Sequence, residues 1–319
     1  MRDFSCFRDA AVSVAAAAGG GGAALDRSLQ AATATVYRAA LSSRKELLVR
    51  VTWTRGVTAT AAVAPGATGL AVAVDEASRA FPSAAATTPR RSVMRARSPL
   101  FLHKKRGTRF FVTEAGTVVA IYWDTTDAKY PAGSSPEPTR DYYLAIVADA
   151  ELALLLGGGD AARQVARRFV AAPRRAFLSR REQFRAPPSP TAALSHSTRC
   201  RFRDDGAEHE VTVVCRGEDW GSRDGEVAVS IDGKKVVEAR RVKWNFRGNR
   251  TVLLGDGAVV EVMWDVHDWW FAGGGSRGAQ FMVKARAAGG GGTLWMDEEM
   301  ASKGQPPGGF FLHMQCHRR

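Results

Sequence analysis

RGNRTVLLGDGAVVEVMWDVHDW, residues 247–269, has the pattern of a β-hairpin and indicates the fold class. Two apolar runs flank the Gly-Asp-Gly triplet at 255–257. Glycine and aspartate both tolerate the positive φ that tight turns need, so the triplet predicts the turn. Every second residue from Val260 to Trp264 is apolar, which predicts that this face of the second strand points into a core.

A second copy of this pattern occupies residues 106–128, RGTRFFVTEAGTVVAIYWDTTDA. The two segments align without a gap and share nine identical residues, where average composition predicts about one or two. Hairpin rules do not require the Arg-Gly pair before the first strand, so the repeat favours internal duplication over two unrelated hairpins. The identical pairs are Arg106 and Arg247, Gly107 and Gly248, Arg109 and Arg250, Gly116 and Gly257, Val118 and Val259, Val119 and Val260, Trp123 and Trp264, Asp124 and Asp265, and Asp127 and Asp268.

The similarity between the halves extends to two further strand-like segments in the same order. AVAVD at 71–75 resembles AVSID at 228–232, and ELLVRV at 46–51 resembles EVTVVC at 210–215. Their offsets differ, as loops of different length would produce. We therefore expect a tandem pair of related β-domains.

Short apolar runs separated by turn signals continue through both halves, which is typical of antiparallel sandwiches. One convincing helix is expected at 160–171, with Asp160 as its N-cap and Pro173 as its stop. The predicted fold is all-β, with two tandem antiparallel β-sandwich-like domains that arose by internal duplication and are joined by one short helix. The predicted boundaries are 1–27 for a flexible N-terminal segment, 28–159 for the first domain, 160–172 for the linker helix and 173–319 for the second domain.

The chain has 319 residues and a net charge of +13, and it contains no apolar run long enough to cross a bilayer. The charge is compatible with nucleic acid or an acidic surface as partner. Its arginines are scattered over several loops, however, and an Arg-, Ala- and Gly-rich composition is also what a GC-rich gene encodes. The N-terminus is balanced in charge, which does not indicate a signal peptide. We expect an intracellular, cytoplasmic protein, with organelle targeting left open.

The four cysteines are too few for a disulfide scaffold in a chain of this size, and none lies in a Cys-x-x-Cys pair. Reduced thiols are expected, with Cys200 and Cys215 placed to face each other on neighbouring strands. The cysteines are Cys6, Cys200, Cys215 and Cys316.

No motif for a nucleophile, a phosphate loop or a zinc-dependent protease is present, so no catalytic and no cofactor-binding residue is predicted. Asp265, His267 and Asp268 offer three potential metal ligands. Capping of backbone N–H groups explains the acidic residues without a metal, and we assign no metal site. Whether this cluster binds a metal is left open.

Two neighbouring groups form the candidate binding surface. Polar residues from Lys243 to Arg247 alternate with apolar ones, which predicts a polar outer row above a buried row of Val242, Trp244 and Phe246. Three consecutive aromatics at 269–271 cannot all face one core across a strand, so one or two can be exposed as a binding patch. The alternative, which the sequence favours, is that Trp270 packs inward and its neighbours cover the end of the sandwich. The candidate residues are Lys243, Asn245, Arg247, Trp269, Trp270 and Phe271.

Several blocks resemble the plant family called domain of unknown function 868. The blocks are MRDFSCFRDAAV at 1–12, LLVRVTW at 47–53, YYLAIVADAELALLLG at 142–157, IDGKKVVEARRVKWNFRGN at 231–249 and VEVMWDVHDWWF at 260–271. The resemblance spans nearly the whole chain, apart from Ala- and Gly-rich inserts that look like loop expansions. It implies a plant protein, and it implies no activity, because the family has no established catalytic residues.

We expect a non-enzymatic binding or interaction protein that uses an outer sheet face or a loop, with a protein as its partner. Two alternatives remain open. One is a carbohydrate-binding module that uses the aromatic group at 269–271. The other is an enzyme with its site at the domain interface. A continuous basic stripe on the surface would instead favour nucleic acid.

Overall fold

The structure is a computed structural model, and it describes eleven segments of the chain. They are residues 29–55, 68–76, 99–131, 135–169, 173–185, 194–203, 206–216, 225–242, 244–271, 277–286 and 310–318. The predicted flexible segment at 1–27 lies outside the described residues.

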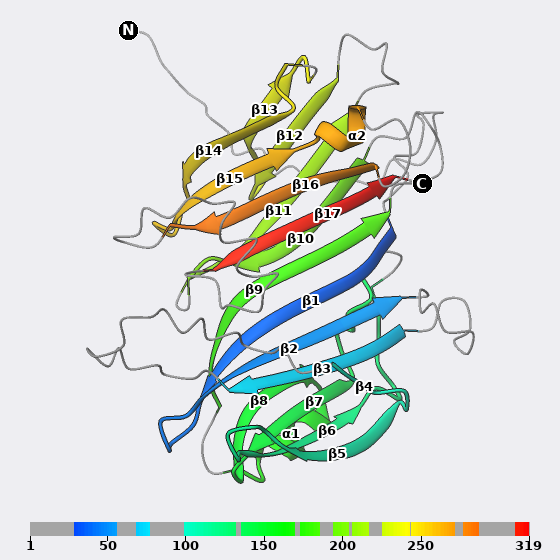
Figure 1. Cartoon of the computed structure of the whole chain (residues 1–319), viewed down its shortest axis with the longest axis vertical. Coiled ribbons are helices and arrows are strands. Elements are labelled where there is room, and N and C mark those ends of the chain that lie inside the picture. The colour runs from blue at the N-terminus through cyan, green and yellow to red at the C-terminus, as the bar shows by residue number, and fades with distance from the viewer. Residues whose placement is uncertain are drawn as a thin grey trace, which may run out of the picture.

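A sheet of nine strands runs through the whole molecule, in the order β14-β15-β16-β17-β9-β1-β2-β3-β4 (Figure 1). Neighbouring strands are antiparallel except β17 and β9, which are parallel. The strands are β14 (Arg247–Leu253), β15 (Val259–Asp265), β16 (Arg277–Ala285), β17 (Phe311–Arg318), β9 (Arg174–Arg185), β1 (Leu29–Ala40), β2 (Glu46–Arg55), β3 (Thr68–Glu76) and β4 (Leu100–Phe101).

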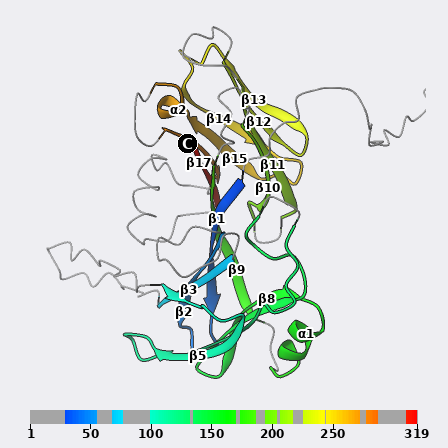
Figure 2. The same ribbon diagram turned by 90° about the vertical axis from the view of Figure 1, so that its right-hand side faces the viewer.

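Two sheets of four strands each pack against one side of the long sheet (Figure 2). Both are antiparallel and follow chain order. The first contains β5 (Arg106–Val112), β6 (Val118–Asp124), β7 (Tyr142–Ala148) and β8 (Glu151–Gly158). The second contains β10 (Leu194–Arg201), β11 (Glu208–Arg216), β12 (Glu226–Ile231) and β13 (Lys234–Arg240).

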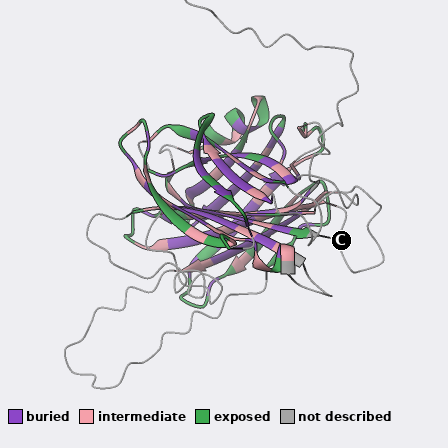
Figure 3. Ribbon diagram, turned by 90° about the horizontal axis from the view of Figure 1, so that it is seen from above, coloured by how far each residue is buried: buried purple, intermediate pink, exposed green. Residues whose placement is uncertain are grey.

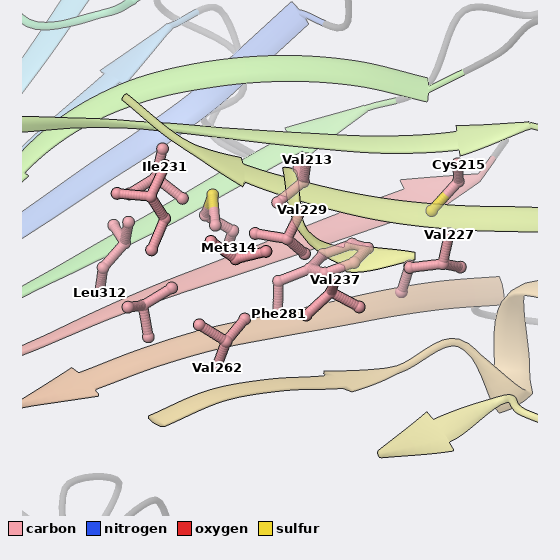
Figure 4. Close-up of a cluster of buried hydrophobic side chains, with 14 of the residues drawn as sticks. Val213, Cys215, Val227, Val229, Ile231, Val237, Val262, Phe281, Leu312 and Met314 are labelled. Atoms are coloured by element: carbon pink, nitrogen blue, oxygen red, sulfur yellow. The ribbon is translucent and has the colours of Figure 1, made fainter. Parts of the chain in front are cut away.

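Each small sheet encloses its own hydrophobic core against the long sheet. The first core contains Trp53 and Trp123, and the second contains Val262 and Phe281, which face Val229 across the gap (Figure 4). Buried and exposed residues alternate along β10 and β11, as the two-residue period of a strand dictates. Figure 3 shows the buried positions following the strands between the sheets. The all-β class predicted from the sequence is confirmed.

The two hairpins aligned by sequence, β5–β6 and β14–β15, have the same register and the same backbone hydrogen bonds. Gly107 lies opposite Trp123, and Gly248 lies opposite Trp264. The indole N–H of Trp123 donates to the Lys104 carbonyl oxygen at 2.8 Å. That of Trp264 donates at 3.0 Å to the carbonyl of Asn245, the aligned residue. The hairpins therefore match beyond what their apolar pattern requires.

Packing of the indole explains the glycine in both Arg-Gly pairs. A Cβ atom at Gly107 would lie 2.8 Å from Cζ2 of Trp123, and one at Gly248 would lie closer still to the same atom of Trp264. Contacts this short do not occur between ordinary side chains, so only glycine lets the ring lie flat across the neighbouring strand. Hairpin rules do not explain the glycine of the two Arg-Gly pairs. Packing against the tryptophan ring of the neighbouring strand does.

We expect Gly248→Ala to lower the free energy of unfolding by about 1–3 kcal/mol, because the added methyl group must displace the Trp264 ring. Chemical denaturation measures the loss. Gly255→Ala in the adjoining turn is the control, since a Cβ atom there would meet nothing within 4 Å. Equal losses for the two variants would contradict the packing explanation.

Only glycine takes a positive φ in these two turns. The φ of Gly116 is 87° and that of Gly257 is 82°, whereas Asp256 keeps a negative φ. Asp256 acts through its side chain, whose Oδ1 accepts a hydrogen bond from the Ala258 N–H at 3.0 Å. In the Asp232-Gly233 turn, by contrast, both residues have a positive φ, 52° and 76°.

Helical structure differs from the prediction in two places. Helix α1 (Asp160–Ala166) is shorter than expected, and its N-cap is Gly159, so Asp160 is the first helical residue and not the cap. It packs its buried Ala162 toward the outer face of the first small sheet. A second short helix, α2 (His267–Phe271), was not predicted. Its three aromatic residues continue the apolar character of β15, so the sequence did not indicate the change from strand to helix.

The predicted contact between Cys200 and Cys215 is wrong. Both lie on the adjacent strands β10 and β11, but Cys200 pairs with His209 and Cys215 pairs with Leu194, at opposite ends of the ladder. Both thiols are free and buried. Burial raises the pKa of Cys200 to about 12 and also raises the pKa of Cys215, so neither thiol forms the reactive thiolate readily at neutral pH.

Candidate functional site

A groove of about 460 Å³ opens at the side of the first sandwich, where β4 and β5 are the outermost strands of their sheets. This volume falls in the range of sites that hold small molecules or parts of larger ligands. The segment that connects the two strands forms much of its wall. The lining residues are Phe101, Leu102, His103, Lys104, Arg106, Gly107, Thr108, Arg109 and Trp123.

The inner wall of the groove is apolar and fixed in place. Trp123 is only 4% exposed, and the missing side chain of Gly107 leaves its ring facing the groove. Leu102 is buried and donates its N–H to the Leu70 carbonyl at 2.8 Å, which ties the connecting segment to β3. A ligand here would therefore meet a preformed wall.

An exposed aromatic pair lies at the rim. Phe101 is 57% exposed, and its ring stacks on the imidazole of His103 with 6.3 Å between centroids and 25° between planes. Flat rings at a rim suit stacking or packing against a ligand.

The rim also carries uncompensated positive charge. The side chains of Lys104, Arg106 and Arg109 are exposed, and none forms an ion pair with another residue that the structure describes. In the second half the situation differs, because Arg247 Nε binds Asp265 Oδ2 at 2.7 Å. Among the described residues these three cations therefore form no ion pair, although Asp124 lies opposite Arg106 in the β5–β6 ladder.

The described part of the predicted polar row does not form one strand, because Asn245 precedes β14 and Arg247 is its first residue. Arg241 has a φ of 55°, and the Trp244 N–H donates to the Arg241 carbonyl at 2.9 Å. Trp244 is 84% exposed, so the expected burial of this residue is wrong. Asn245 and Arg247 are exposed, and Lys243 lies outside the described residues.

The two described rings of the aromatic group, Trp269 and Trp270, do not form an open platform. Trp269 is 5% exposed and belongs to the second core, and the half-buried Trp270 packs against the same core. Both rings turn inward because α2 replaces the expected strand. Of Phe271 the structure describes the helical backbone alone. Trp269 therefore does not share an exposed face with Asn245 and Arg247. Just before α2, the Val266 N–H donates to the Phe246 carbonyl at 2.9 Å.

The acidic residues after β15 are engaged within the chain. Asp265 binds Arg247 through Oδ2 and accepts the His267 N–H through Oδ1 at 3.0 Å. His267 Nδ1 lies 2.9 Å from Oδ1 of Asp268. No group of three metal-ligating side chains occurs in the part of the chain that the structure describes. The aligned Asp124 caps Thr126 in the same way, at 3.0 Å, which favours capping as the shared role.

A buried polar cluster occupies the junction of the two halves, where an enzyme site was the alternative expectation. Arg180 Nε lies 2.6 Å from Glu182 Oε1, and its Nη1 lies 2.7 Å from Glu137 Oε2. Glu182 also contacts His196 Nε2 at 2.7 Å and accepts the Thr198 hydroxyl at 2.6 Å. The cluster joins β9 both to β10 and to the 129–140 connection of the first half.

The electrostatics of this cluster hold Glu182 ionised. Burial by itself would raise the pKa of Glu182, but Arg180 and the hydrogen bonds from His196 and Thr198 outweigh it and keep the pKa at about 2. The carboxylate is fully buried and each of its oxygens is engaged. The arrangement suits a structural tie and offers no proton donor or nucleophile directed at an open space.

A family model described as plant protein of unknown function (DUF868) matches residues 28–312. The chain belongs to this family. No curated protein matches the DUF868 chain, and no solved structure matches it either. Among its described residues, no helix is long and apolar enough to cross a membrane.

Sequence reasoning missed the groove of this DUF868 protein, although a signal was present. The run Leu100-Phe101-Leu102-His103-Lys104-Lys105-Arg106 places three apolar residues, two of them exposed, shortly before three consecutive cationic ones. Such a run is ordinary on a solvated loop, so composition alone gives it no weight. The run contributes to a groove because it connects β4 and β5, which are the outermost strands of two different sheets. That position depends on the strand order of both sheets and cannot be read from the run itself.

Proposed function

We propose that this protein is a non-enzymatic binding protein and that the β4–β5 groove holds an anionic ligand. The observation that carries the proposal is the set of unpaired cations, Lys104, Arg106 and Arg109, beside a preformed apolar wall. Opposite charges attract strongly across a partly desolvated groove, and exposed rings at its rim add contact area. A protein partner, our expectation from the sequence, can supply such an anion through acidic side chains.

Charge reversal at the groove tests the proposal. We expect Arg109→Glu to weaken binding of a fluorescent polyanion, such as a labelled heparin fragment, by about tenfold or more, because it replaces attraction with repulsion. Fluorescence anisotropy at two salt concentrations measures this, and the wild-type affinity should fall as salt rises.

The chain supplies a matched control for this experiment. Arg250 is the aligned residue on β14, it is also exposed, and Arg250→Glu changes the net charge by the same amount. The control should keep nearly all of its affinity. Equal losses at both positions would mean that overall charge, and not the groove, governs binding.

The two alternative functions have less support. A carbohydrate-stacking platform needs exposed rings, and Trp269 lies in the core. An enzyme at the junction of the halves needs a reactive group facing a space, and Glu182 is enclosed by its partners. A binding role therefore fits the described residues best.

We also propose that the two halves arose by tandem duplication, with domains at 28–159 and 173–319 around the helical linker at 160–172. Each half contains two successive four-stranded meanders, β1–β4 with β5–β8 and β10–β13 with β14–β17, which supports the proposal. The matching indole and turn hydrogen bonds add to it. Strand β9 has no counterpart in the repeat and lies between β1 and β17. An experimental structure with a different strand order around Trp123 and Trp264 would contradict it.

A further inference from the structure

We infer that the anionic ligand of the β4–β5 groove is a single-stranded nucleic acid, whose phosphates bind the cations of the rim and whose bases stack on the exposed rings. The inference rests on the proposed function, because it assigns a chemical class to the anion of the same groove. Each nucleotide carries one phosphate and one planar base, so a single strand presents charge and flat apolar surface in alternation. The groove places cations and rings side by side over one short stretch of chain.

The cations at the groove form a row. Lys104, Lys105 and Arg106 are consecutive, and Arg109 follows on the same strand as Arg106. All four residues are exposed. The guanidinium group is a planar fork that matches two oxygens of a phosphate, and each phosphate that a cation neutralises releases counterions to the solvent. A row of separate cations therefore suits a chain of phosphates better than a ligand with one anionic group.

A pair of stacked rings lies next to these cations. Phe101 is 57% exposed, and its ring stacks on the imidazole of His103, which is exposed as well. Both residues line the groove. Leu102, between them, is buried and bonded to the Leu70 carbonyl of β3, so the pair is held on a fixed backbone. Proteins that bind single strands use exposed aromatic rings beside basic side chains in this way.

The inner wall of the groove adds a second flat surface. Gly107 leaves the ring of Trp123 facing the groove, and the indole N–H already donates to the Lys104 carbonyl. The ring therefore offers its face to a ligand and not a hydrogen bond. The described lining residues include no Asn, Gln, Asp or Glu side chain to bond the edge of a base. Because every base has a face that can stack, we expect binding to depend little on sequence.

A single strand uses both features of the groove, and the competing ligands use one. The bases of a duplex are already paired and stacked on one another, so a duplex would bring phosphates to the cations and leave the rings without a partner. An acidic segment of a protein would bring carboxylates, but it has no planar ring fixed beside each charge. The combination of rings and cations therefore favours the single strand.

The second half of the chain does not repeat this combination. When the alignment of the two hairpins is extended at the same offset, the buried Val242 takes the position of Phe101, and the neutral Asn245 takes that of Lys104. The arginine that begins β14 is bound to an aspartate at 2.7 Å. The same hairpin thus occurs twice, and the row of cations beside a stacked ring pair is a specific feature of the first copy.

Fluorescence anisotropy of the full chain with labelled oligonucleotides tests the inference. A length of about 12 nucleotides lies within the site sizes of single-strand binding proteins. We expect the single strand, as RNA or as DNA, to bind about tenfold or more tightly than a duplex of the same length or a polyglutamate of the same charge. Phe101→Leu keeps an apolar side chain but removes the ring, and it should weaken single-strand binding about tenfold.

The chain supplies matched controls for the ring and for the charge. Trp244 is an exposed ring in the second half, so Trp244→Leu removes a ring away from the groove and should leave the affinity unchanged. Phe101→Trp keeps a ring at the rim and should retain the affinity. Arg109→Glu should weaken single-strand binding about tenfold or more and make it less dependent on salt, because one phosphate contact is lost. Arg250→Glu should do neither.

Each contrary outcome has a distinct meaning. If a duplex binds as tightly as the single strand, or if Phe101→Leu binds as well as Trp244→Leu, the assignment to a single strand is wrong. Equal losses in Phe101→Leu and Phe101→Trp would likewise contradict stacking. If a heparin fragment or polyglutamate binds in an Arg109-dependent way while the oligonucleotide does not, the inference fails and the proposed function stands. If no anion depends on Arg109, both fail. Unchanged denaturation midpoints exclude misfolding of the variants.

Discussion

Glu182→Gln should lower the free energy of unfolding by about 3–5 kcal/mol, one of the largest losses expected from a single change in this protein. The substitution keeps the shape of the side chain but removes one of the two carboxylate charges that compensate the buried Arg180. Breaking one partner of a buried ion pair costs more than the pair contributes, because the remaining charge stays desolvated. Urea denaturation measures the loss.

An exposed glutamate provides the control for this experiment. Glu238 binds Arg240 and Lys235 at the surface, so Glu238→Gln makes the same chemical change in a solvated ion pair. Solvent screens such pairs, and little change in stability is expected. A similar loss at both positions would show that burial does not increase the contribution of the Glu182 ion pair to the free energy of unfolding.

The same residue also predicts a response to acid. The folded-state pKa of Glu182, about 2, lies below its ordinary value of 4.5. Its contribution to stability is therefore complete above about pH 4.5 and is lost as the pH falls through about 2. The difference in stability between wild type and Glu182→Gln should shrink over this window, which denaturation at a series of pH values measures.

Gly157→Ala should destabilise the protein by about 3 kcal/mol or more. Gly157 has a φ of 109°, a conformation that residues with a side chain rarely adopt. A Cβ atom there would also overlap the Tyr142 carbonyl oxygen across the β7–β8 ladder, and backbone cannot move aside as a flexible side chain can. The backbone strain and the steric overlap then both lower the free energy of unfolding.

A variant at the neighbouring Gly158 is the control. It tests whether any alanine at the end of β8 destabilises the protein. A Cβ atom at Gly158 would meet nothing within 4 Å, so Gly158→Ala should change the free energy of unfolding by no more than about 0.5 kcal/mol. Thermal unfolding of the two variants under identical conditions compares them. Similar midpoints would contradict the role assigned to Gly157.

The elements that could be predicted from the sequence are those with local signals. Alternation ending at Trp264 predicted β15, and the Gly-Asp-Gly triplet at 255–257 predicted the β14–β15 turn, because strand period and turn chemistry are set by adjacent residues. The helix at Trp269 was missed because an apolar triplet fits a strand end and a helical turn equally well.

The features that sequence reasoning could not reach depend on distant pairing. Exposure of Trp244 follows from the left-handed backbone at Arg241, an arginine that gives no sign of it. The groove likewise requires that β4 and β5 both end their sheets, which follows from pairings across the whole chain. The surface predicted from the sequence therefore lies near the second hairpin, whereas the groove lies beside the first.

Strand β9 gives the molecule a particular order of assembly. Its two neighbours are β1, made long before it, and β17, made long after it. As the polypeptide leaves the ribosome, β9 can join β1 at once, but its other edge waits through the synthesis of the whole second half. An edge left open for so long is a place where nascent chains stick to one another. Chaperone capture during translation would be most useful in this interval.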